Sequence, residues 1–110
     1  MKVFHAVFFT VMCTVVFAQD YRPPDGYVPD KETAVKIAEA VLTPIYSKKL
    51  IESEEPFEAS LKGDMWTVTG TLRCPDGKGG LATTPQCRGG VAVVRISKLD
   101  ARVISMEHGR

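Results

Sequence analysis

The hydrophobic periodicity of the chain changes once, from that of a helix to that of strands, and this change limits the folds open to it. Over residues 31–46 the apolar side chains recur at helical spacing, at Ala34, Ile37, Ala38, Val41 and Ile45. Asp30 can cap the first turn, and Glu32 suits its positive end. The pattern predicts one amphipathic helix, about Lys31 to Tyr46, which Pro44 should kink or end.

Alternation of period two begins after a polar stretch at residues 48–55 and predicts two strands of a hairpin. The apolar positions before the Gly63-Asp64 turn are Phe57, Ala59 and Leu61, and those after it are Trp66, Val68, Gly70 and Leu72. Trp66 shares the phase of Val68 and Leu72, so we expect it to fill the core between helix and sheet.

Two further strands are expected at Val91–Ser97 and Arg102–His108, with a turn at 98–101 between them and with Ile104 and Met106 on one face of the last strand. One helix followed by four strands predicts a single α+β domain. Its N-terminal amphipathic helix would pack on a four-stranded antiparallel sheet.

The first eighteen residues have the features of a secretory signal peptide. Lys2 precedes an apolar stretch at 7–17 that is shorter than the roughly 20 residues that span a bilayer, which disfavours a membrane anchor. We expect cleavage between Ala18 and Gln19, which would remove Cys13; lipid attachment at Cys13 is disfavoured because Met12 precedes it. The predicted organisation is a signal peptide at 1–18, an irregular leader at 19–29 and a domain at 30–110.

Two cysteines remain after cleavage, Cys74 and Cys87, and they bracket a loop rich in glycine at 73–90. An even pair in an exported domain predicts a disulfide, because the compartment is oxidising. A zinc site is the alternative, but two cysteines with no histidine nearby supply too few ligands. The disulfide would pin the base of an exposed loop, where we place the partner-binding residues Asp76, Lys78, Gln86 and Arg88.

Charge limits the classes of partner. Removing Lys2 from the 14 basic residues leaves 13, which balance the 13 acidic residues, so the mature domain has no general basic field for nucleic acid. No basic run exceeds Lys48-Lys49, so a membrane-surface site has no support either. Three acidic residues cluster before the first strand, and we interpret them as a solvated linker and not as a cation site: Glu52, Glu54 and Glu55.

No residues are predicted to be catalytic or to bind a cofactor or metal. His108 is the only histidine after residue 18 and follows Glu107, so it could act as a general base. Because no motif supplies a nucleophile, we interpret it as a surface residue at a strand end. The glycines of 77–80 do not follow P-loop spacing.

Several segments, in order, resemble the NTF2-fold immunity protein family: residues 26–40, Pro44-Ile45-Tyr46, 66–72, 89–92, Ile96-Ser97-Lys98 and 104–109. The resemblance implies an NTF2-like scaffold that performs no chemistry and neutralises a cognate bacterial toxin by binding it. With the signal peptide, it implies a target that works in the periplasm. The turn Asp100-Ala101-Arg102 departs from the Asp-Gly-Arg turn that is more typical.

Two alternatives stay open from the sequence. A helix followed by strands is also similar to exported PepSY-like or cystatin-like inhibitors, which would act on a peptidase. A small NTF2-like enzyme would need a polar pocket between helix and sheet, with His108 or a buried acid as its base. The oligomeric state is not indicated.

Overall fold

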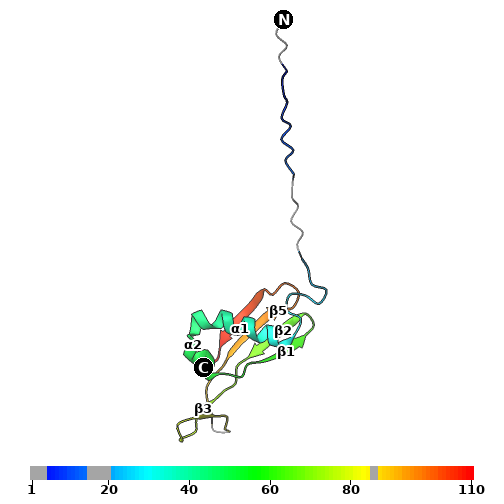
Figure 1. The fold of residues 1–110 in the computed structure, drawn as a ribbon. Coiled ribbons are helices and arrows are strands. Elements are labelled where there is room, and N and C mark those ends of the chain that lie inside the picture. The colour runs from blue at the N-terminus through cyan, green and yellow to red at the C-terminus, as the bar shows by residue number, and fades with distance from the viewer. Residues whose placement is uncertain (1–4, 15–20, 85–86) are drawn as a thin grey trace.

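The computed structural model describes residues 5–14, 21–84 and 87–110, so the predicted cleavage site at Ala18–Gln19 and the candidate residue Gln86 lie outside it. Two helices, α1 (Lys31–Tyr46) and α2 (Lys48–Ser53), accompany a four-stranded antiparallel sheet (Figure 1). The sheet has the order β1-β2-β5-β6, formed by β1 (Glu58–Lys62), β2 (Met65–Thr69), β5 (Ala92–Ser97) and β6 (Val103–His108). The predicted α+β class, with a helix on an antiparallel sheet, is confirmed.

Helix α1 has the predicted bounds because its ends are fixed locally. The Asp30 carboxylate accepts a hydrogen bond from the Thr33 amide at 2.8 Å, which caps the first turn. At the other end Ser47, with φ of 78°, donates its amide to the Thr43 carbonyl at 2.9 Å. Pro44 lies in the last turn, and the helix ends at Tyr46.

The core lies between α1 and the two central strands. Its fully buried members are Val28 of the leader, Ala34, Ala38 and Leu42 of α1, Val68 of β2, and Ala92, Val94 and Ile96 of β5. Trp66 is 4% exposed, as predicted for a core residue, and its indole Nε1 donates to the Val28 carbonyl at 2.8 Å. The leader around Val28 is therefore held against the domain, although it forms no helix or strand in its described part.

The interpretation of Glu52, Glu54 and Glu55 as a solvated linker is wrong for Glu54, whereas Glu52 and Glu55 are exposed. Ser47 caps α2 by accepting the Leu50 amide at 3.3 Å, and this short helix buries Ile51 and Glu54. The tertiary contacts of its inner face, and not its average polarity, decide its conformation.

Two strand predictions also need correction. The strand expected at Trp66–Leu72 ends at Thr69, because the Thr71 amide donates to the Glu54 carbonyl at 2.7 Å and takes the chain away from the sheet. In β6 a bulge shifts the register, so that Ser105 opposes Arg95 and Val103 opposes Ile96. Ile104 is consequently 47% exposed and does not share the buried face of Met106.

The turn between β5 and β6 forms without the usual glycine. Ala101 takes a φ of 62°, and the Asp100 carboxylate accepts the Arg102 amide at 3.0 Å, which fixes the turn. That hydrogen bond is the main cause of the lowered pKa of Asp100. Within the described residues no helix is both long enough and apolar enough to cross a bilayer.

Candidate functional site

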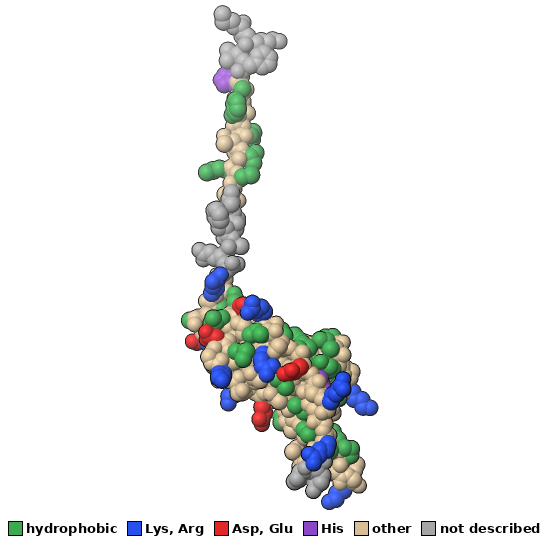
Figure 2. Space-filling view, turned by 180° about the vertical axis from the view of Figure 1, so that it is seen from behind, with side chains coloured by type: hydrophobic (Ala, Val, Ile, Leu, Met, Phe, Trp, Pro, Cys, Tyr) green, Lys and Arg blue, Asp and Glu red, His purple; other side chains and the backbone are tan. Residues whose placement is uncertain are grey.

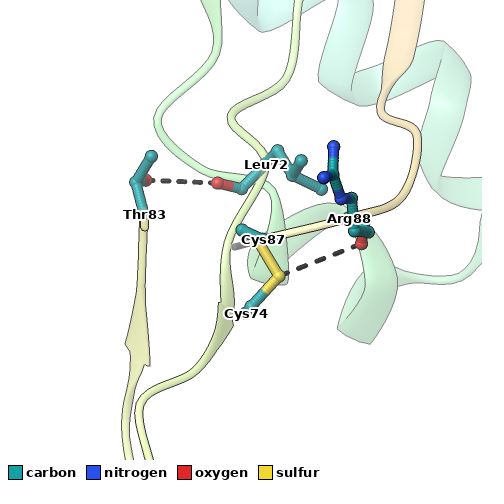
Figure 3. The surroundings of a disulfide bond; sticks show 5 residues. All are labelled: Leu72, Cys74, Thr83, Cys87 and Arg88. Atoms are coloured by element: carbon teal, nitrogen blue, oxygen red, sulfur yellow. Dashed lines mark hydrogen bonds between the residues drawn. A yellow bond between two sulfur atoms is a disulfide. The ribbon is translucent and has the colours of Figure 1, made fainter. Parts of the chain in front are cut away.

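The segment between β2 and β5 projects from one end of the sheet as a stapled hairpin, which we define as residues 72–90 (Figure 1). The sequence predicted a long loop at 73–90, but β3 (Cys74–Pro75) pairs with β4 (Leu81–Ala82) in a small separate sheet. A disulfide joins Cys74 to Cys87, with 5.6 Å between their Cα atoms. Thr83 Oγ1 donates to the Leu72 carbonyl at 3.1 Å beside it (Figure 3).

Asp76 organises the tip of the hairpin. Its Oδ1 accepts the Lys78 amide at 2.7 Å and the Gly80 amide at 3.1 Å, and these bonds lower the pKa of the carboxyl. Gly77 and Gly79, with φ of 77° and 85°, provide the left-handed conformations that the tip needs. Asp76 was predicted to contact a partner, and the structure gives its carboxylate this structural role.

Among the predicted partner-binding residues, Asp76, Lys78 and Arg88 are all exposed, and Lys78 and Arg88 are the two cations. Arg73, at the start of the hairpin, adds a third cation and donates through Nη1 to the Glu55 carbonyl at 3.2 Å. Three cations and the single anion Asp76 give residues 73–88 a formal charge of +2. Figure 2 shows Lys and Arg side chains on this end of the molecule.

Glu54, which the sequence placed in a solvated linker, instead forms the root of the hairpin. Its side chain is 7% exposed, and Oε1 accepts the Ala92 amide at 2.6 Å, where the chain enters β5. A Cβ atom added to Gly70 would lie 2.9 Å from Oε1 and 3.0 Å from Phe57, so only glycine fits without a shift. Glu54 therefore fixes both ends of the hairpin, at residues 70–71 and at Ala92.

The second Glu54 oxygen, Oε2, lies 3.0 Å from Nε2 of His108. His108 was interpreted as a surface residue, but its side chain is only 22% exposed and its ring lies 5.3 Å from that of Tyr46. Its Nδ1 lies 2.7 Å from the Gly109 carbonyl oxygen, which can only accept a hydrogen bond, so Nδ1 must carry a proton. The Glu54 carboxylate at Nε2 also accepts, so the ring must be protonated on both nitrogens to donate to both partners. Burial opposes this charge, but the hydrogen bonds to Glu54 and Gly109 outweigh it and raise the pKa of His108.

Sequence reasoning missed Glu54 and misread His108 because their meeting is a tertiary contact. One signal was present: Ser47 is a good N-cap, and Ile51 and Glu54 are three residues apart, on one face of a short helix. The three glutamates do not converge, since Glu52 is paired with Lys48 at 3.6 Å while Glu54 turns inward. Among the described residues no three His, Cys, Asp or Glu side chains are grouped to hold a metal.

His108 lines neither of two hollows in the surface of the described domain. One, of about 500 Å³, lies between the leader at 22–27 and the turn at Leu99-Asp100. The other, of about 650 Å³, is a groove between α1 and β1 over Val35, Phe57 and Ala59. At its α1 side, burial and then the carboxylate of Glu55 raise the pKa of Glu39.

Comparison with known proteins gives the family. A family model described as NTF2 fold immunity protein matches residues 33–110. The chain belongs to this family. The resemblance drawn from the sequence is thus confirmed.

The uncharacterized protein YhhH of Escherichia coli (strain K12) is a relative with 29% identity over 83 residues. The aligned region covers 76% of this chain but only 58% of YhhH, so the chain spans less than two thirds of that relative. No solved structure matches the chain.

Proposed function

We propose that the chain is an exported immunity protein that binds and neutralises a toxin in the periplasm. Family membership carries the proposal, because it implies toxin neutralisation by binding. The signal peptide predicted at 1–18 would deliver the domain to an oxidising compartment. The Cys74–Cys87 disulfide fits that compartment, since such bonds persist there and are rare in the cytosol.

The stapled hairpin is the part of the domain best suited to contact the toxin. It is exposed at its tip, and the disulfide and the Asp76 turn hold its conformation before binding. A preordered loop loses less conformational entropy when it binds. Its cations Lys78 and Arg88 stand on a domain of balanced charge, so we infer that the contacted toxin surface is acidic.

The experiment pairs the chain with the product of the gene beside its own, because immunity genes usually lie next to toxin genes. The neighbouring product is directed to the periplasm of a test strain, and colony formation is counted with and without the chain. We expect the full-length chain to restore growth and a form lacking residues 2–18 to fail. If the full-length chain neither restores growth nor captures the purified neighbour, the proposal is wrong.

A charge-reversal variant tests the hairpin separately. Lys78→Glu with Arg88→Glu places like charges against an acidic surface and should weaken toxin binding by at least about tenfold. The matched control is Lys48→Glu with Lys49→Glu, which makes the same charge change on the exposed face of α2. If both double variants bind as tightly as the wild type, the toxin contacts another surface.

A further inference from the structure

The two outer strands of the main sheet differ in how they are protected. Strand β6 carries a bulge at Ile104, a feature that prevents further strands from adding to an edge. Strand β1 has no bulge and pairs with β2 residue by residue, from Glu58 opposite Thr69 to Lys62 opposite Met65. Among the described residues no strand lies on the other side of β1 (Figure 1), so β1 is the edge able to accept one.

The backbone groups on this edge belong to Ala59 and Leu61. The Gly70 amide donates to Ala92 of β5 at 2.9 Å, and by alternation Val68 and Trp66 also direct their backbone groups to β5. The other β2 residues therefore bond to β1, through Glu58, Ser60 and Lys62. The N–H and C=O groups of Ala59 and Leu61 are left pointing outward.

We propose that a second copy of the chain adds its β1 to this edge, antiparallel and centred on Ser60, to give a two-fold symmetric dimer with a continuous sheet. In this register Ala59 of one copy exchanges two hydrogen bonds with Leu61 of the other, and the symmetry repeats the pair. All outward N–H and C=O groups of the two residues then have partners.

The charges of β1 match in the same register. Glu58 lies directly opposite Lys62 of the second copy, and Lys62 opposite Glu58 of the second copy. Opposite charges at facing positions of an antiparallel pair are favourable, whereas like charges there are destabilising. Both side chains are exposed in a single copy of the chain, so they are free to pair across the proposed interface.

The groove between α1 and β1 supplies the apolar part of the interface. Ala59 and Leu61 face the helix side of the sheet, because they oppose the buried residues Val68 and Trp66. Leu61 is 44% exposed. In the dimer, Leu61 of one copy lies across from Ala59 of the second copy and over the groove of that second copy, which Val35 and Phe57 line. A single register thus pairs the outward backbone groups, forms both ion pairs and covers both Leu61 side chains. This agreement favours a second copy of the chain over an unrelated strand.

Sedimentation equilibrium of the chain, purified in the form that cells accumulate, tests the dimer through a charge exchange. We expect a dimer for the wild type. Glu58→Lys and Lys62→Glu, each placing like charges in contact, should each raise the dimer dissociation constant at least about tenfold. The double variant restores opposite charges and should restore the dimer.

Lys48→Glu, a reversal on α2 away from β1, is the control and should leave the dimer unchanged. Circular dichroism checks that each variant is folded. A wild type that stays monomeric, single reversals that dimerise as tightly as the wild type, or a double variant that remains monomeric would each overturn the proposal.

Amide hydrogen exchange gives a second measurement that depends on register. Raising the protein concentration should slow exchange at Ala59 and Leu61, while Val103 on the bulged edge should keep its rate. If the chain dimerises and these two amides still exchange at the monomer rate, the interface lies elsewhere. If they become protected only when a different protein is added, the edge serves a hetero-partner and the dimer is wrong.

Discussion

Glu54 and His108 are 54 positions apart in the sequence, yet Oε2 of one lies 3.0 Å from Nε2 of the other. The pair joins the end of α2 to the end of β6, at the place where the stapled hairpin leaves and rejoins the domain. Because Glu54 also accepts the Ala92 amide, one buried carboxylate holds three segments of the chain. The orientation of the hairpin therefore depends on this pair.

Glu54→Gln should lower the free energy of unfolding by about 2 kcal/mol, the scale of a buried hydrogen bond to a charged group. Glutamine keeps an acceptor for Ala92 but loses the charge that His108 faces. Urea denaturation measures the loss, and Glu52→Gln, at a side chain that is 55% exposed, is the control. Equal stability of the two variants would show that the Glu54 charge contributes nothing.

The same pair should make stability depend on pH near neutrality. The folded state raises the pKa of His108 above its ordinary value of about 6.5, so the folded state binds the proton more tightly than the unfolded chain does. This contribution is fully present below the ordinary pKa and is lost as the pH rises through the folded pKa. Urea midpoints across this range should fall in the wild type and stay flatter in His108→Gln; parallel curves would contradict the assignment.

The main helix and the central strands were predictable because their signals are local and repeated. Asp30 caps α1, its apolar spacing persists over four turns, and Trp66 and Val68 alternate with threonines. The glycine pattern and the two cysteines likewise marked residues 73–90 as a distinct segment.

The errors share one cause, which is that distant contacts override local pattern. The bulge at Ile104 depends on how β6 meets β5, and a run of polar residues concealed α2. Glu54 looked like a solvated acid because nothing near it in sequence indicates Ala92 or His108. The hairpin segment could be recognised from the sequence, but the tertiary contacts that hold its base could not.

Leu42→Ala tests the position of the core. Leu42 is fully buried in α1, so truncating it should lower the free energy of unfolding by roughly 3 kcal/mol through lost burial and the cavity left behind. The matched control is Leu99→Ala, at a turn position that is 55% exposed, which should change stability by less than about 1 kcal/mol. Chemical denaturation of both variants measures the difference, and similar losses would place the core elsewhere.

The disulfide should stiffen the hairpin more than it stabilises the domain. Its loop lies beyond β2 and β5, so replacing Cys74 and Cys87 with serine should leave the core and the Trp66 fluorescence unchanged. In the entropy model, closing a loop of this length raises the free energy of the open chain by about 3 kcal/mol. Trypsin should then cut after Lys78 or Arg88 at least about tenfold faster, since cleavage follows the population of open loop.

Mass spectrometry of the first tryptic fragments locates the cuts and separates this prediction from general unfolding. Leu99→Ala, a substitution at an exposed turn away from the hairpin, should digest at the wild-type rate. Two free thiols at Cys74 and Cys87 in exported protein, found under non-reducing conditions, would contradict the staple itself. Equal cutting with the bond present and absent would instead show that β3, β4 and the Asp76 turn hold the hairpin without it.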